Sequence, residues 1–254
     1  MAVALDEIAR GLVTLLTGVL YVGVGRVILS RDLADDARTA NHLFATWWIG
    51  LAILYLASAP LTIAGALGFR SYPLTLAFIQ AALVALCIAV WGILGFLLYV
   101  YRGNHRWLVP TAMFYGALAF GLLFLVSWME PTGFESGVGT SLAFTRKLGA
   151  SGSVLIGLAF SVPIFAAALA YASLLFRVTE RLPRYRIAMV SGAFAIQFGW
   201  SIVRSVTGLS RRFPDSKVLL VANQVLAIAV PLVILMAYRP PTWVAKRLQA
   251  AASA

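Results

Sequence analysis

Charged residues are scarce in this sequence, and their scarcity decides the class of protein. Only 11% of the 254 residues are charged, whereas about a quarter of the residues in a typical soluble domain carry charge. Hydrophobic residues make up 61% of the chain, and the mean hydropathy is +0.91. The composition therefore excludes an ordinary soluble domain and indicates an integral membrane protein.

Acidic residues, lysine and cysteine are also few. The nine acidic residues all fall in the termini or in polar connections, which disfavours proton coupling through buried carboxylates. The block RDLADDAR, residues 31–38, has no second acidic cluster to complete a magnesium site of a membrane transferase, so we expect a solvated loop. The lone Cys87 excludes an internal disulfide. No lysine lies inside the last apolar run, where a retinal pigment would need one.

Histidine is nearly absent, which limits the possible cofactors. His42 and His105 fall near the inner ends of the second and third apolar runs and would ligate haem iron only if they met at the same depth. Both are more simply explained as interface residues. No set of His, Cys or Glu has the spacing of a metalloenzyme site, and no glycine-rich phosphate loop is present. We therefore expect no cofactor, no metal and no catalytic residues.

Long apolar runs are abundant, and they set the fold class. A membrane-spanning helix needs about 20 mostly apolar residues, and these runs are too long and uniform for barrel strands. We expect a single all-α domain over residues 1–254, a polytopic bundle of seven transmembrane helices. The predicted spans are 8–29, 43–67, 74–101, 111–129, 153–176, 187–208 and 218–238. The Gly- and Ser-rich stretch 130–152 is expected to form a flexible cap over one mouth.

The distribution of basic residues predicts the orientation. Twelve lysines and arginines fall on one side of the predicted bundle and eight on the other. Because basic residues favour the cytoplasmic side, we expect the N-terminus outside and the C-terminus inside, in a multi-pass protein of the cell membrane. The net charge of +11 also attracts phosphate, but basic residues that flank spans meet anionic head groups of the lipid bilayer. We therefore expect no nucleic-acid partner.

The chain contains an internal echo. The third span ends in LLYVYRGNHRWL and the seventh in ILMAYRPPTWVAKRL, so both give Tyr-Arg, a helix breaker and then Trp on the same predicted side. This echo predicts two three-helix units in the same orientation, joined by the fourth span in a 3+1+3 plan. In architecture the plan resembles the sugar transporters of the PQ-loop class, although the Pro-Gln pair that names them is missing here.

Three further blocks carry a second resemblance. HLFATWWIGLA, RYRIAMVSG and AYRPPTW are similar to stretches of prokaryotic, archaeal seven-helix integral membrane proteins. That group has no established activity, so the resemblance implies a seven-helix membrane fold and no particular function.

Small residues within the spans predict close helix contacts. Gly18, Gly23 and Gly25 lie in the first span, and Gly92 and Gly95 lie in the third. Because a glycine lets two helix backbones approach, we expect these positions at helix interfaces.

One predicted span carries an unusual polar stripe. Gln197 and Arg204 are two turns apart on one face, with Ser201 between them and Trp200 beside them. Polar groups at membrane depth normally face the bundle or a watery cavity. We expect partners at a similar depth on other spans. These partners are Gln80, Asn223 and Gln224, with Glu130 as the nearest carboxylate for Arg204.

This polar cluster has two interpretations. In the first, amides and hydroxyls bond across helices for about 0.6 kcal/mol each, and Arg204 extends to the outer head groups. In the second, the cluster lines an outward pocket that binds or passes a small neutral, weakly anionic or lipid-like molecule. The aromatic walls of that pocket would come from Tyr21, Tyr55, Trp91, Tyr115, Tyr171 and Trp200.

Two further functions remain open from the sequence. A receptor or sensor would signal through the basic inner segment FRVTERLPRYR, where Arg181, Arg184 and Arg186 would bind an acidic protein partner. A non-catalytic subunit of a membrane complex needs no ligand at all. An enzyme is not expected, because no nucleophile with its base is visible.

Overall fold

The computed structural model describes residues 2–31, 35–102, 105–134, 142–146, 148–207, 217–244 and 246. In this part of the chain seven long helices follow one another. They are α1 (Ala2–Leu29), α2 (Asp35–Ala66), α3 (Tyr72–Arg102), α4 (Leu108–Trp128), α5 (Ala150–Leu174), α6 (Arg181–Thr207) and α8 (Lys217–Tyr238). A single 3-10 turn, η1 (His105–Trp107), precedes α4, and the short strands β1 (Pro131–Phe134) and β2 (Leu142–Phe144) pair antiparallel.

Six helical segments in the described residues are long and apolar enough to cross a membrane. They are Leu5–Leu29, Ala37–Ala66, Tyr72–Tyr101, His105–Trp128, Val154–Leu174 and Val221–Tyr238. The prediction of an all-α, multi-pass, membrane-embedded protein is confirmed at this level. The predicted sixth span, 187–208, falls on the 27-residue helix α6, which is not among the six.

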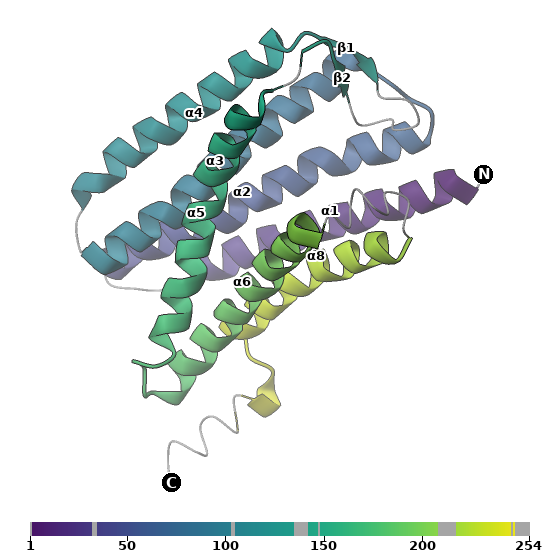
Figure 1. The fold of residues 1–254 in the computed structure, drawn as a ribbon. Coiled ribbons are helices and arrows are strands. Elements are labelled where there is room, and N and C mark those ends of the chain that lie inside the picture. The colour runs from purple at the N-terminus through teal and green to yellow at the C-terminus, as the bar shows by residue number, and fades with distance from the viewer. Residues whose placement is uncertain are drawn as a thin grey trace.

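The helices are arranged as a ring with one helix outside it. The contacts around the ring run α1 to α2, α2 to α3, α3 to α5, α5 to α6, α6 to α8 and α8 back to α1. Helix α4 packs mainly on α3 and lies at the edge of the bundle (Figure 1). The start of α1 and the β1–β2 hairpin lie toward one end of the molecule, and the end of α8 lies toward the other (Figure 1).

Glycines set the tight contact between α1 and α2. A Cβ built on Gly18 would lie 2.8 Å from Leu56, and one on Gly25 would lie 2.6 Å from Ile49. Gly11 meets Ile63 in the same way, at 2.5 Å. The three glycines recur every seven residues, as do their three partners, so one glycine stripe receives one aliphatic ridge along two antiparallel helices.

Helices α2 and α3 also approach at glycines. A Cβ on Gly92 would lie 2.9 Å from the carbonyl oxygen of Leu43, and one on Gly95 would lie 3.1 Å from the Leu43 side chain. The expected interface roles of Gly18, Gly25, Gly92 and Gly95 are therefore confirmed. The expectation for Gly23 is wrong, because a Cβ there would meet nothing within 4 Å.

The stretch 130–152 differs from the flexible cap that its composition predicted. The carboxylate of Glu130 pairs with Arg146 at 3.1 Å, and the Arg146 guanidinium lies over the Trp128 ring, 5.0 Å from its centroid. The hydroxyl of Tyr72 donates to the carbonyl of Pro131 at 3.0 Å. The described part of this stretch is thus fixed to the ends of α3 and α4, which lie at the outer side of the predicted topology.

Candidate functional site

Aromatic side chains fill the centre of the helix ring. Neighbouring ring centroids in this aromatic cluster are 5.1 to 6.3 Å apart, the range of favourable aromatic contacts. The aromatic cluster consists of Tyr21 from α1, Phe44, Trp47, Trp48 and Tyr55 from α2, Phe96 from α3, Tyr171 from α5 and Phe194 from α6. Side chains from five helices therefore meet at this point.

Two indole groups in the aromatic cluster are unusual. Trp47 and Trp48 are 1% and 0% exposed, and within the described residues neither Nε1 atom has a hydrogen-bond acceptor. The hydroxyl oxygen of Ser191, less than one turn from Phe194 on α6, is also buried without a described partner. A buried polar group left without a hydrogen bond costs about 1–3 kcal/mol. Three such groups in or beside the aromatic cluster are therefore a candidate ligand site rather than a packing detail.

The local sequence explains how α2 carries these groups to the centre. Residues 43–45, 47 and 48 are all buried, so this part of α2 is covered on nearly every side by α1, α3 and α6. Stacking of Tyr21 on Trp48, with ring planes 17° apart, and the contact of Trp47 with Phe194 hold the two indoles in place. The indole N–H groups are thereby fixed in an apolar setting, where their interaction with an acceptor is strong.

The polar residues predicted on α6 and α8 continue from this aromatic cluster. Gln197 follows Phe194 on the inward face of α6, three residues farther toward the predicted outer end. Asn223 is two turns from the buried Val230 on α8 and shares its face. The two helices pack side by side and run in opposite directions (Figure 1).

A hydrogen bond fixes the relative depth of these two helices. The hydroxyl of Tyr185 on α6 donates to the carbonyl of Met236 on α8 at 3.3 Å. Gln197 lies twelve residues along α6 from this bond, and Gln224 lies twelve residues from it along α8. At about 1.5 Å per residue, both amides lie about 18 Å from the bond, which places them at the same level.

The other predicted site residues fall into different places. Gln80 is half-buried on α3, which packs mainly on α2, α4 and α5, so the structure does not bring it to α6 and α8. The side chains of Trp200, Ser201 and Arg204 lie outside the described residues. Glu130, expected to face Arg204, forms its described ion pair with Arg146 instead.

The residues predicted to form the aromatic walls of the pocket also lie in different places. Tyr21, Tyr55 and Tyr171 belong to the aromatic cluster. Trp91 donates instead to the carbonyl of Leu108 at 3.4 Å, and the Tyr115 hydroxyl donates to the carbonyl of Ala159 at 2.8 Å. Trp91 and Tyr115 therefore use their polar atoms to fasten neighbouring segments.

Neither histidine takes part in the central site. The His105 ring packs edge-on against Tyr99 with centroids 4.8 Å apart, and the carbonyl of His42 accepts a hydrogen bond from Thr46. The described residues contain no group of three His, Cys, Asp or Glu that could hold a metal.

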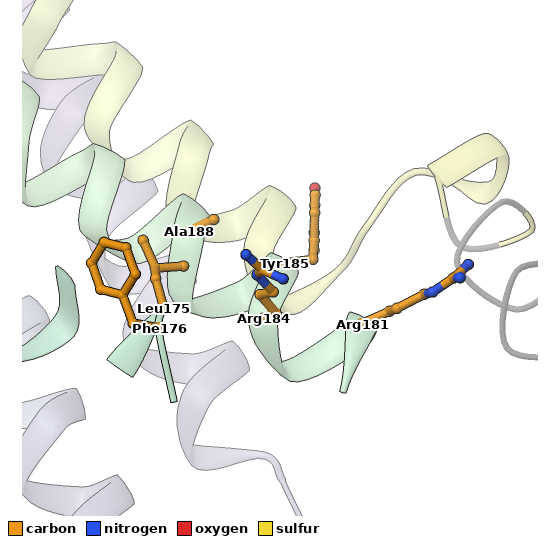
Figure 2. A pocket seen from close by; sticks show the side chains of 6 residues that line it. All are labelled: Leu175, Phe176, Arg181, Arg184, Tyr185 and Ala188. Atoms are coloured by element: carbon orange, nitrogen blue, oxygen red, sulfur yellow. The ribbon is translucent and has the colours of Figure 1, made fainter. Parts of the chain in front are cut away.

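The basic residues predicted to bind a partner separate onto two faces of α6. Arg181 and Arg184 line a surface groove of about 510 Å³ together with Leu175, Phe176, Tyr185 and Ala188. Figure 2 shows Arg184 beside Tyr185, while Arg181 extends away from the apolar side chains. Arg186 is not part of this lining, and its Nε atom is buried without a described hydrogen-bond partner. Of the three arginines grouped as one surface from the sequence, Arg181 and Arg184 line this groove.

Sequence reasoning missed the two central tryptophans. Tryptophan is usually an interface residue in membrane proteins, and Trp47 and Trp48 lie only a few residues inside the predicted start of their span at 43. The signal that could have found them is that the two tryptophans are adjacent. Neighbouring side chains on a helix point about 100° apart, so both cannot lie on one narrow lipid-facing stripe.

No protein-family model, no curated protein and no solved structure matches the chain.

Proposed function

We propose that the chain is a seven-span integral membrane protein that binds a small neutral, weakly anionic or lipid-like molecule inside its helix bundle and facilitates its passage. The observation that carries this proposal is the pair of buried indole N–H groups of Trp47 and Trp48, which have no acceptor among the described residues. A ligand carbonyl, hydroxyl or carboxylate oxygen would accept these hydrogen bonds and offset the cost of burying them.

The arrangement of polar groups along the ring supports passage as well as binding. The amides of Gln197 and Asn223 lie on the inward faces of α6 and α8, on the outer side of the aromatic cluster. The Ser191 hydroxyl lies toward the inner side of Phe194. A small molecule would therefore meet hydrogen-bonding groups before, within and beyond the aromatic cluster. The aromatic cluster itself would act as the narrow point that separates the two sides.

The packing also supports the 3+1+3 plan. If α1 is exchanged with α5, α2 with α6 and α3 with α8, each contact between neighbouring helices of the ring corresponds to another such contact. The tyrosines of the two similar span ends, Tyr101 and Tyr238, lie at junctions that correspond under this exchange. Tyr101 donates to the carbonyl of Ala170 at the α3–α5 junction, and Tyr238 lies under Arg31 at the α8–α1 junction. We infer two parallel three-helix units with α4 as the linker, α6 as the remaining span, the N-terminus outside and the C-terminus inside.

A flux assay tests the proposed passage. The purified protein in liposomes should carry at least one member of a panel of polyols, sugars and small carboxylates. The variants Gln197→Ala and Asn223→Ala should each lower that flux. Gln80→Ala is the matched control, because it removes the same amide from α3 and should leave the flux unchanged. If the wild-type protein moves none of these solutes, passage is not its function.

A second candidate function is supported by the surface groove. Arg181 and Arg184 stand at the edge of an apolar groove beside Phe176, which is 90% exposed. A receptor would bind an acidic protein partner through this combination. Reversing the charge of Arg181 and Arg184 should abolish capture of that partner. Capture that survives the double reversal would remove this candidate.

A further inference from the structure

A second polar group lies at the inner end of the ring, apart from the aromatic cluster. Arg31 lies two residues beyond the end of α1, Arg186 lies in the second turn of α6, and Tyr238 ends α8. These residues are far apart in the sequence and come together because α1 and α6 both pack on α8. The start of α2 is tied to the same place, since the Asn41 amide donates to the carbonyl of Ile28 at 2.6 Å.

The guanidinium groups of Arg31 and Arg186 have no counter-ion among the described residues. The Arg31 guanidinium lies over the Tyr238 ring, 5.5 Å from its centroid, so the ring binds one face and leaves the N–H edges free to donate. The buried Nε of Arg186 has no acceptor among the described residues, and neither arginine forms an ion pair within them. Burial lowers the pKa of Arg186, and the nearby charge of Arg31 lowers it further, with Tyr238 acting in the opposite sense.

This arrangement is costly without an anion. Two like charges that lie close together repel, and partial burial reduces the screening that water would supply. An arginine remains protonated under physiological conditions, so losing a proton does not relieve the repulsion. The planar N–H edges of guanidinium groups match the oxygens of phosphate or carboxylate in a bidentate geometry.

We propose that Arg31, Arg186 and Tyr238 form an anion-binding site for a phosphate-type group at the inner end of the bundle. The guanidinium edges of the two arginines hold the oxygens of the anion, and the Tyr238 ring orients Arg31. The site lies where an inner-leaflet lipid head group and a dissolved phosphate can both arrive, so the shared chemistry is a phosphate oxyanion. This inference stands on the geometry of these three residues and holds whether or not a molecule passes through the ring.

The experiment uses the full-length protein in detergent and measures thermal unfolding in phosphate and in chloride at equal ionic strength. Phosphate should raise the Tm of the wild-type protein in a saturable way, and both Arg186→Gln and Arg31→Gln should weaken phosphate binding by about tenfold or more. Arg184→Gln is the matched control, because it removes the same charge from the opposite face of α6 and should bind phosphate as the wild type does. In chloride, Arg186→Gln should melt at or above the wild-type temperature, because it removes the repulsion.

A second measurement identifies the source of the phosphate. The wild type and Arg186→Gln are reconstituted in nanodiscs of phosphatidylcholine and phosphatidylglycerol, and native mass spectrometry counts the lipids that each retains. Selective retention of phosphatidylglycerol that is lost in Arg186→Gln supports the site with a lipid head group as its ligand. A saturable phosphate shift without lipid retention supports the site with a dissolved anion.

Three results would overturn the proposal. The first is that phosphate stabilises no more than chloride and no anionic lipid is retained. The second is an equal loss in Arg184→Gln and Arg186→Gln, which would indicate a diffuse basic surface. The third is a large fall in the Tm of Arg186→Gln in chloride, which would mean that protein carboxylates already neutralise the arginines. Asp32, Asp35 and Asp36 are the nearest in sequence to Arg31, and their side chains lie outside the described residues.

Discussion

Gly92 of α3 packs directly against the backbone of Trp47 on α2. A Cβ at Gly92 would lie 2.9 Å from the Trp47 backbone nitrogen, and neither helix backbone can move aside cheaply. We therefore expect Gly92→Ala to destabilise the protein by about 1–3 kcal/mol through overpacking and to shift the central tryptophans. Thermal unfolding in detergent measures this change.

Gly23 supplies the control for this substitution. It lies inside a helix, as Gly92 does, but a Cβ there would meet nothing within 4 Å. Gly23→Ala should be neutral or should stabilise the protein by up to about 1 kcal/mol, because alanine favours the helix more than glycine does. Equal melting temperatures for the two variants would show that α2 and α3 are not in close contact at Gly92.

The indole N–H groups give a prediction about stability as well as binding. Trp48→Phe removes a buried donor that has no described partner, which relieves about 1–3 kcal/mol, and leaves a small cavity that costs about 1 kcal/mol. The empty protein should therefore keep or slightly raise its Tm. Trp91→Phe is the comparison, because Trp91 donates to the Leu108 carbonyl and its loss should lower the Tm. A clear fall in stability for Trp48→Phe alone would mean that its N–H is satisfied in the folded protein.

The number of spans gives a prediction about the two termini. If α6 crosses the membrane in addition to the six apolar segments, the chain has seven spans, and the N-terminus and the C-terminus lie on opposite sides. In a Cys87→Ala background, a membrane-impermeant maleimide applied to intact cells should label a cysteine placed at Ala2 and should spare one placed at Ala254. Labelling of both positions, or of neither, would contradict a seven-span topology.

The β1–β2 hairpin should depend on one ion pair. Arg146 pairs with Glu130 at 3.1 Å and lies over the Trp128 ring, but both charged side chains are about half exposed. Arg146→Gln should therefore weaken the local structure by only about 1 kcal/mol, and proteolysis in the hairpin should rise by about fivefold while the Tm barely changes. Arg177→Gln, at the opposite end of the molecule, should leave the cleavage rate unchanged. An unchanged rate in Arg146→Gln would show that the pair does not hold the hairpin.

Hydropathy predicted the positions of the helices well and their ends less well. Each predicted span falls on a long helix, because about 20 apolar residues in lipid must satisfy their backbone hydrogen bonds internally. Helix α2, however, begins at Asp35 rather than at 43. Its first turns are polar and helical, and a hydropathy profile detects the apolar part of a helix rather than the whole of it.

The candidate site was predicted only where a polar residue interrupts an apolar run. Gln197 and Asn223 met this condition, and the structure places them on adjacent helices. Trp47 and Trp48 did not meet it, because an indole counts as an interface residue whether its N–H is paired or not.

The basic inner segment was treated as one surface, although Arg184 and Arg186 are about 200° apart around α6 by helical geometry alone. Their placement on different faces of α6 was therefore present in the spacing of the sequence.

Native mass spectrometry of protein purified gently from its own membrane is the decisive test of a ligand site at Trp47 and Trp48. We expect the wild-type protein to retain a small molecule, and the double variant Trp47→Phe with Trp48→Phe to stay folded but lose it. An empty wild-type protein, or a molecule retained equally by the double variant, would contradict a ligand site at the two buried indole groups.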